Sequence, residues 1–307
     1  MDNRRESPLE GGRSITRREL AVTDNQQFGG AWTAKKLDIL KRYLNFYSTA
    51  LKNQNFNLHY VDPFSGTGTV DADGELITSE PIEGSAAISL GVANPFFKYH
   101  FNEPHAGRRA RLEAIVSQHP ERNVSISAVD ANTMIQSVCH ELRHRRGDRA
   151  VFFIDPFGCQ LDWASLKLIG SIPGNDVWVW FPVSAVMRQT PRDHSKIQDG
   201  WRKRLNKLFG GNEWEQTIYQ ASQATQVTDL FGAPIEEKLT RESGTKALDN
   251  FVTSKLDEIF QYVHPQPVPF YNANNSLLFN LYFAMSNDSP KATGLAQRVI
   301  NHILKLS

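Results

Sequence analysis

Short apolar runs alternate with amphipathic stretches through the middle of the chain. The runs are rich in β-branched and aromatic residues, which predicts strands at 58–62, 97–102, 124–129, 150–155 and 177–182. The stretches between them have helical spacing and predict helices at 85–92, 105–118, 132–145 and 162–169. Near-continuous apolar strands separated by helices are typical of a parallel sheet covered on both faces. The pattern therefore predicts an α/β fold with a Rossmann-like, doubly wound, mostly parallel sheet.

The N-terminal region divides into two parts. Residues 1–27 mix both charges with Pro and Gly and have little apolar periodicity, which predicts a mobile N-terminal tail. A nucleic-acid-binding arm is the weaker interpretation, because acidic residues interleave with the arginines. Leucines at helical spacing then predict a helix from about 33 to 52, with Thr33 as its cap.

The later part of the chain departs from the strand–helix rhythm. Residues 28–190 form the predicted core. Residues 191–263 read as helices at 194–210, 213–227 and 246–263 with no convincing strand, which predicts a helical insertion or lid. Residues 264–307 complete the core with an antiparallel hairpin and a helix. The hairpin joins 267–272 to 276–285 through an Asn-rich turn, and the final helix covers about 290–306.

Composition narrows the class of protein. The chain has 307 residues, 40% of them hydrophobic, and a net charge of +1, so no overall field favours nucleic acid or acidic lipid. Two cysteines are too few for a disulfide framework, an Fe–S cluster or a Cys-rich zinc site. No apolar run reaches the roughly 18 residues of a membrane span. We expect a cytoplasmic protein without a membrane partner.

The stretch VDPFSGTGTV at 61–70 is a glycine loop of a kind that binds several cofactors. A phosphate-binding loop needs a Lys after its last Gly, and Thr69 follows Gly68 instead. A dinucleotide fingerprint needs a third Gly near position 71, where Asp71 would repel a pyrophosphate. The alternative that this loop is only a structural turn between a strand and a helix stays open.

Acidic residues stand where four successive strands should end: Asp62, Glu103, Asp130 and Asp155. Ligands of open α/β sheets bind outside the carboxyl ends of the strands, so these carboxylates should share one rim. Any one of them alone could cap a helix or form a turn. Together they suit a ligand with a cationic sulfonium, an amino group, a ribose diol and an adenine.

With these residues the chain resembles class I S-adenosylmethionine-dependent methyltransferases over roughly 58–182 and the terminal hairpin. The resemblance implies that the first-strand loop wraps the methionine end of the donor. The loop residues are Asp62, Phe64, Ser65, Gly66 and Gly68. It also implies that Glu103 holds the ribose hydroxyls and that Asp130 lies beside the adenine amino group.

A closer resemblance, to the three-Cys-motif partner protein family, spans nearly the whole chain. Its segments are WTAKKLDILKRYL (32–44), VDPFSGTGT (61–69), EGSA (83–86), FFIDPFG (152–158), VWFPVSAVMR (179–188) and LYFAMSN (281–287). The resemblance implies a partner protein that carries the three-Cys motif. The motif itself is not expected in this chain.

The DPFG segment at 155–158 is similar to the fourth-strand motif of DNA amino-methyltransferases. In those enzymes an acidic or amide side chain orients an exocyclic amine and an aromatic ring stacks on an extruded base. Asp155, Pro156 and Phe157 are the candidate catalytic residues, although Phe157 stands one position early and Gly158 takes the usual aromatic position. The alternative is that Phe157 packs in the core and Asp155 caps the next turn. Arg188 is a candidate clamp for a substrate phosphate or carboxylate, or a solvated side chain.

The stretch HELRH at 140–144 matches the zinc-protease pattern literally. On a helical wheel His140 and His144 lie opposite the apolar face, and no third ligand follows downstream. We therefore expect a solvated helix face and no metal. The tryptophans Trp163, Trp178 and Trp180 should pack in the core.

Three functional hypotheses follow. The first is an S-adenosylmethionine-binding enzyme that transfers a methyl group to nitrogen or oxygen of an acceptor. The second is a non-catalytic partner that keeps the donor pocket for another protein. The third is a nucleic-acid amino-methyltransferase or nucleic-acid-binding protein in a mobile-element or defence setting.

Overall fold

The computed structural model describes residues 31–67, 69–70, 82–145, 147–221, 239–241 and 245–306. The predicted tail and Gly68 lie outside the described residues, and so does most of the segment after the glycine loop.

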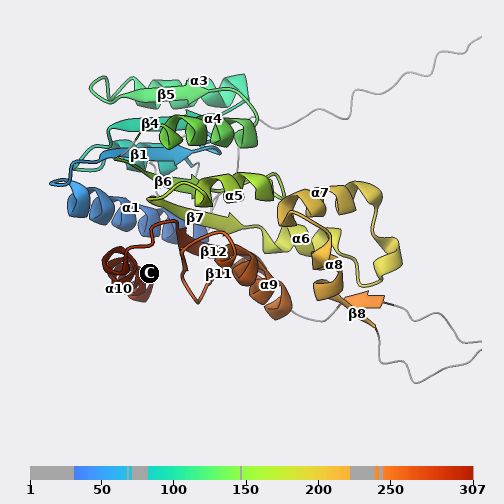
Figure 1. The fold of residues 1–307 in the computed structure, drawn as a ribbon. Coiled ribbons are helices and arrows are strands. Elements are labelled where there is room, and N and C mark those ends of the chain that lie inside the picture. The colour runs from blue at the N-terminus through green and yellow to red at the C-terminus, as the bar shows by residue number, and fades with distance from the viewer. Residues whose placement is uncertain are drawn as a thin grey trace, which may run out of the picture.

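An eight-stranded sheet is the centre of this part of the chain (Figure 1). Its strand order is β10-β12-β7-β6-β1-β4-β5, and β11 also pairs with β12. The parallel strands are β1 (Asn57–Asp62), β4 (Lys98–Asn102), β5 (Val124–Ser127), β6 (Asp148–Ile154) and β7 (Asn175–Phe181). Three strands are antiparallel to their neighbours: β10 (Tyr262–Val263), β11 (Val268–Tyr271) and β12 (Leu277–Met285).

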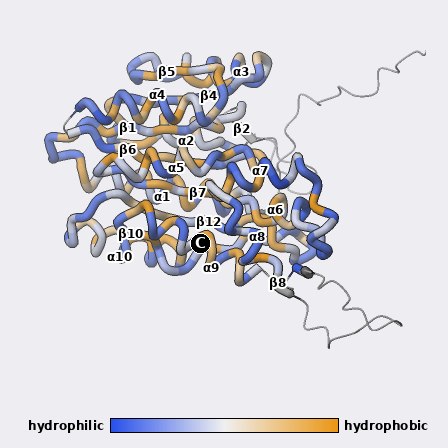
Figure 2. Tube along the Cα trace, turned by 45° about the vertical axis from the view of Figure 1, so that its right-hand side comes forward, coloured by the Kyte–Doolittle hydropathy of each residue, from blue (hydrophilic) through white to orange (hydrophobic). Residues whose placement is uncertain are grey.

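Helices cover both faces of the sheet. One hydrophobic cluster joins the sheet to α1 (Ala31–Leu51), α2 (Ser85–Leu90), α3 (Ala106–Val116) and α10 (Pro290–Leu306). The opposite cluster joins it to α4 (Ala131–Arg143), α5 (Trp163–Gly170), α7 (Asp199–Phe209), α8 (Glu213–Ile218) and α9 (Lys246–Asp257). Alternate residues of one strand belong to different clusters, Phe153 to the first and Phe152 to the second. The hydrophobic positions accordingly run through the middle of the molecule, where the strands lie (Figure 2).

This topology confirms the predicted fold class. Five parallel strands are followed by an antiparallel strand, β12, that lies directly beside β7. That order is the doubly wound sheet with a C-terminal antiparallel hairpin of the class I methyltransferase-like fold. The predicted turn at 273–275 joins β11 to β12, and Asn275 adopts the positive φ of 55° that Asn tolerates better than most residues.

Several local predictions were wrong. The helix expected to run through 263 ends at Asp257, because the chain then pairs with β12 as β10, where Tyr262 faces Met285. The helix expected at 213–227 ends at Ile218, and Tyr219–Ala221 forms β8 paired with β9 (Leu239–Arg241). Pairing with distant strands overrides the local helical pattern in both places.

Three short elements had no counterpart in the predictions. They are α6 (Val183–Gln189) and the two-stranded ribbon of β2 (Thr69–Val70) with β3 (Ile82–Glu83). Elements of two to seven residues give too little periodicity to be recognised from sequence.

The boundaries proposed for the insertion stay a prediction. In the structure α7, α8 and α9 share a hydrophobic cluster with α4 and α5 on one face of the sheet.

The predicted packing of Trp163, Trp178 and Trp180 is confirmed, since all three are buried. Among the described residues no helix is both long and apolar enough to cross a membrane.

A buried histidine pair lies on adjacent strands, away from the carboxyl ends. His59 Nδ1 is 3.0 Å from His100 Nε2, and His59 Nε2 is 3.3 Å from an Asp148 carboxylate oxygen. Burial, with the neighbouring His59, lowers the pKa of His100 to about 3. His59 also has a lowered pKa, chiefly through burial. The folded protein therefore keeps the His100 ring neutral over most of the acidic range.

We predict that His100→Gln makes stability less sensitive to acid. Below the ordinary His pKa of 6.5 the unfolded chain binds a proton at position 100, whereas the folded chain does so only near a pKa of about 3. The contribution of His100 is therefore complete above pH 6.5 and is lost as the pH falls. Urea unfolding at several pH values should show wild type losing about 1.4 kcal/mol per pH unit relative to the variant between about pH 6 and pH 4. A constant difference would contradict this explanation.

Candidate active site

The four acidic residues predicted to share a rim do follow the carboxyl ends of parallel strands. Asp62 ends β1, Glu103 follows β4, Asp130 follows β5 and Asp155 follows β6. These strands are parallel neighbours, so their ends form one edge of the sheet. Their environments along this edge differ strongly.

The loop after β1 is held by hydrogen bonds to Asp62. The Ser85 hydroxyl donates to its carboxylate at 2.6 Å, and the Phe64 amide donates to the other carboxylate oxygen at 3.2 Å. The Ser65 hydroxyl donates to the Asp62 carbonyl at 2.7 Å. Gly66 has a φ of 62°, a conformation that costs a residue with a side chain roughly 1–2 kcal/mol. Glycine is therefore favoured there for a backbone reason.

Asp62 is a fully buried carboxyl group. Burial raises its pKa to about 7, and the nearby Asp155 carboxylate raises it further, against the lowering effects of the Ser85 and Phe64 hydrogen bonds and Lys36. Near neutral pH this side chain exists in both protonation states. A cation placed beside it would shift it to the carboxylate.

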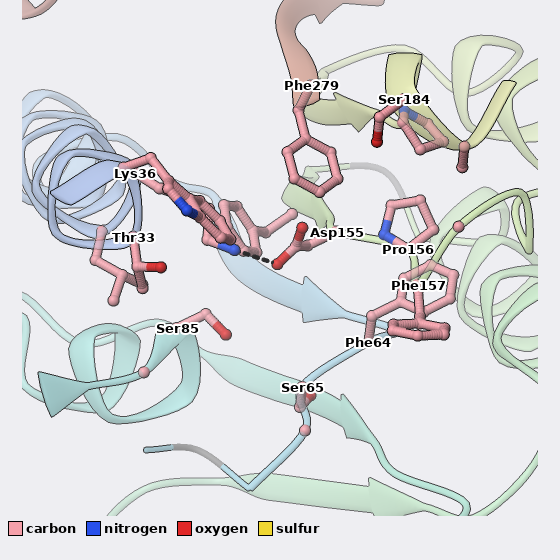
Figure 3. A pocket seen from close by; sticks show the side chains of 18 of the residues that line it. Thr33, Lys36, Phe64, Ser65, Ser85, Asp155, Pro156, Phe157, Ser184 and Phe279 are labelled. Carbon is pink, nitrogen blue, oxygen red and sulfur yellow. Dashed lines mark hydrogen bonds and ion pairs between the residues drawn. The ribbon is translucent and has the colours of Figure 1, made fainter. Parts of the chain in front are cut away.

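A cavity of about 310 Å³ opens next to this loop (Figure 3). Its walls include Phe64, Ser65 and Gly66 from the β1 loop together with Asp155, Pro156 and Phe157 from the β6 loop. Arg188 of α6 and Phe279 of β12 also line it. The structure thus brings most of the predicted site residues into one cavity. None of the cavity-lining residues comes from the described part of 191–263.

An ion pair that the sequence reasoning missed crosses this cavity. Lys36 Nζ of α1 lies 2.5 Å from a carboxylate oxygen of Asp155, as the dashed line in Figure 3 marks. The Lys36 side chain is 11% exposed and the Asp155 side chain 28%. Lys36 Nζ also lies 5.2 Å from the ring centroid of Trp180. The helix before the first strand therefore supplies a cation to the site.

A signal for Lys36 was present in the sequence. Lys36 stands one turn before Leu40 in the apolar stripe of its helix, where a lysine is unexpected. A charged residue in such a stripe is rarely buried without a partner. The partner, 119 residues away, could not be read from the pattern.

Phe157 projects at the mouth of the cavity, where its side chain is 67% exposed. Figure 3 shows it beside Phe64. The alternative that Phe157 packs in the core is therefore wrong. Asp155 pairs with Lys36 through Oδ2, and its capping of the next turn stays a prediction. Gly158 follows with a φ of 63°, which explains why this position carries no aromatic side chain.

Glu103 does not line the cavity and already has protein partners. One oxygen accepts from the His105 amide at 2.7 Å and from an Arg108 guanidinium nitrogen at 3.0 Å, and the other lies 3.0 Å from Arg108 Nε. Its side chain is 5% exposed. Two of about four acceptor positions are thus used, both on one oxygen, because the Arg108 Nε contact lacks hydrogen-bond geometry.

Asp130 is the N-cap of α4. Its Oδ1 accepts from the amides of Asn132 at 2.9 Å and Thr133 at 3.3 Å. The residue is exposed and does not line the cavity. Glu103 and Asp130 therefore stand apart from the cavity, and the fully buried Asp62 does not line it either.

Thr33 was predicted to cap α1, but the helix begins at Ala31 and Thr33 lies within its first turn. The residue is buried and lines the cavity, and its hydroxyl has no hydrogen-bond partner within the described part of the chain. An unsatisfied buried hydroxyl of this kind is a ready contact for a polar ligand group.

The histidines of the HELRH stretch point away from the core, as predicted. His140 of α4 and His144, the C-cap of that helix, are both exposed, with ring centroids 4.7 Å apart. No group of three potential metal ligands occurs in the described ranges.

Comparisons with known proteins add little. No family model matches the chain, and no curated protein sequence matches it. A solved structure of protein LPL1258 from Legionella pneumophila str. Philadelphia 1, family model DUF519, is similar at 14% identity and a TM-score of 0.47, over 86% of this chain and 91% of that chain. The CurJ carbon methyltransferase is similar at 13% identity and a TM-score of 0.40, over 85% of this chain and 57% of that chain. At these TM-scores neither likeness carries an argument, and the fold assignment rests on the strand order.

We predict energetic coupling between Lys36 and Asp155. Removing either partner leaves a partly buried charge unpaired, so Lys36→Met and Asp155→Asn together should cost less than the sum of the single changes. A double-mutant cycle by urea unfolding should give a coupling energy of about 1–2 kcal/mol. The pair of Lys41 and Glu83 is the control, because it also involves α1 but both side chains are more than half exposed. Its coupling should be near zero; equal coupling in the two cycles would contradict the prediction.

Proposed function

We propose that this protein binds S-adenosylmethionine at the β1 loop and transfers its methyl group to a nitrogen or oxygen atom of an acceptor in the cavity. The observation that carries the proposal is the cavity itself, which joins the Gly66 loop to the segment from Asp155 to Phe157. A donor loop and an acceptor-orienting carboxylate in one cavity is the arrangement that methyl transfer requires.

The residues of the β1 loop fit the methionine end of such a donor. The buried Asp62 carboxyl is the natural partner of the donor's ammonium group, since its pKa of about 7 lets it ionise when a cation arrives. Phe64, Ser65 and Gly66 would surround the methionine chain, with the backbone of Gly66 closest. The unsatisfied Thr33 hydroxyl offers a further polar contact from α1.

The ribose and adenine contacts are more constrained. Glu103 would accept from a ribose hydroxyl through Oε2 while keeping its hydrogen bond from Arg108 on Oε1. Asp130 would accept from the adenine amino group through Oδ2, because Oδ1 caps α4. The donor would then extend along the sheet edge from Asp62 toward Asp130.

At the acceptor end the bound donor supplies an electrophilic methyl group. The Lys36 ammonium donates a hydrogen bond to one oxygen of the Asp155 carboxylate, so Asp155 acts as a hydrogen-bond acceptor. Lys36 occupies one carboxylate oxygen, and the other can accept from an N–H or O–H of the acceptor and orient its lone pair. Pro156 shapes the loop, Phe157 offers a ring for stacking, and Arg188 can hold an anionic group.

We also propose that the chain is a member of the three-Cys-motif partner family, on the motif resemblance, and that it acts beside a protein carrying that motif. The non-catalytic alternative keeps the same donor pocket. Unlike the catalytic proposal, the non-catalytic alternative predicts that the protein transfers no methyl group, so Asp155→Ala would have no transfer to abolish. Cytoplasmic localisation stays a prediction from composition.

Donor binding should depend on pH through Asp62. Below pH 7 the donor's ammonium must displace a proton from this carboxyl, so affinity should rise by up to about tenfold per pH unit toward neutrality and then level off. Calorimetry in buffers of different ionisation enthalpy measures the released proton. Asp62→Asn should weaken binding and remove the dependence.

Asp176→Asn is the matched control. Burial also raises the pKa of Asp176 to about 7, but this residue lies near the start of β7, away from the cavity. The Asp176→Asn variant should keep the pH dependence of donor binding. Glu103→Ala should weaken donor binding but leave its pH dependence in place. Tight binding of NAD or ATP without binding of the methyl donor would contradict the proposed function.

Asp155→Ala should abolish methyl transfer while leaving donor affinity within about twofold of wild type. The assay is transfer of a radiolabelled methyl group into the nucleic-acid, protein and small-molecule fractions of a cell extract. Asp162→Ala is the control, since Asp162 follows the same loop but makes no side-chain cap on α5. Transfer that survives Asp155→Ala would exclude this residue, and transfer absent from wild type would favour the non-catalytic alternative.

A further inference from the structure

Cations that have no acidic partner among the described residues gather on α6 and α7, next to the cavity. On α7 the charged residues are Asp199, Arg202, Lys203, Arg204 and Lys207. Arg202 pairs with Glu215 at 2.9 Å and with Asp199 at 3.6 Å. Within the described residues the side chains of Lys203, Arg204 and Lys207 form no ion pair or hydrogen bond, and all three residues are exposed. The outer side of α7 is therefore a row of uncompensated positive charge.

This row lies beside the candidate active site. α7 packs against α5 and α6, and Figure 1 places α6 and α7 together beyond the carboxyl end of β7. Arg188 of α6 lines the cavity and is exposed, with no partner in the described part of the chain. Burial raises the pKa of the Cys159 thiol to about 11, while Arg204 and Arg188 both lower it. Both guanidinium groups thus act on the residue directly after the loop at 155–158.

The aromatic side chain at the cavity mouth adds a second kind of contact. Phe157 is 67% exposed, which is unusual for a phenylalanine beside a deep cavity. An exposed aromatic ring next to a row of cations is a combination that binds unpaired nucleic-acid strands, since bases stack on the ring while phosphates contact the cations. An acidic protein partner would account for the cations but not for the ring.

We propose that the basic track of Arg188, Lys203, Arg204 and Lys207 binds the phosphate backbone of a single-stranded nucleic acid, and that the methyl acceptor is one of its bases, stacked on Phe157. The proposal rests on the function proposed above and specifies its acceptor. The base would enter the cavity, where Asp155 can accept a hydrogen bond from an exocyclic amine. The flanking phosphates would run outward over α6 and α7.

The test is binding of fluorescently labelled single-stranded oligonucleotides, DNA and RNA in separate arms, with the duplex of the same sequence as a third arm. Wild type should bind a single strand with affinity that falls steeply as salt increases. The triple variant with Lys203→Glu, Arg204→Glu and Lys207→Glu should lose at least about tenfold in affinity. Its log–log salt slope should be smaller by about 2, at roughly 0.7 per lost phosphate contact.

The control is a triple charge reversal on α10, with Lys291→Glu, Arg298→Glu and Lys305→Glu. It changes the net charge equally, and Figures 1 and 2 both show α10 well away from α7. This variant should bind nearly as wild type does. Phe157→Ala should weaken single-strand binding without changing the salt slope, because stacking releases no counterions.

Calorimetry with the methyl donor on the same variants separates the two proposals. Unchanged donor binding together with lost oligonucleotide binding in the α7 variant supports the basic track. Donor binding without salt-dependent oligonucleotide binding would overturn the proposal that the basic track binds nucleic acid. The proposed methyl-donor function would remain. Equal losses in the α7 and α10 variants, or a preference for duplex, would also overturn the track. Absence of donor binding would instead overturn the proposed function.

Discussion

Burial of the central strands on both faces is the constraint on which the rest of the structure depends. Every residue of β7 and nearly every residue of β6 is buried between two layers of helices. Polar side chains on these faces would have to find partners inside the protein. The chain can therefore offer charged groups to a ligand mainly where strands end, and parallel pairing brings those ends to one edge. Asp62 and Asp155 stand at this edge for that reason.

The same burial determines the electrostatics of the site. Asp62 is fully buried, and for that reason its pKa rises to about 7. Asp155 is less buried and has its own cation, Lys36, which reaches it from α1 on one face of the sheet. The two carboxyl groups thus differ in their surroundings, since Asp62 accepts from the uncharged donors of Ser85 and Phe64 whereas Asp155 pairs with a lysine. The arrangement leaves Asp62 able to respond to a bound cation.

Apolar runs were enough to predict the sheet, since strands buried on both faces need continuous hydrophobic sequence. The rim of acidic residues followed from strand order, and the cavity collects Phe64 to Gly66 with Asp155 to Phe157. The sequence could not reveal that Glu103 is paired with Arg108 or that Lys36 pairs with Asp155. The second contact joins residues far apart in the chain, and no local periodicity encodes it. The strand β10 was missed for the same reason, because β12 supplies its hydrogen bonds.

The proposed methyl-donor site begins at Asp62 and continues into the cavity. A crystal structure of the protein with the demethylated donor, S-adenosylhomocysteine, tests this placement. We expect the amino group of the ligand beside the Asp62 carboxylate, its sulfur facing the cavity and its ribose within hydrogen-bond distance of Glu103. A ligand bound elsewhere, or one whose sulfur faces away from Asp155, would contradict it.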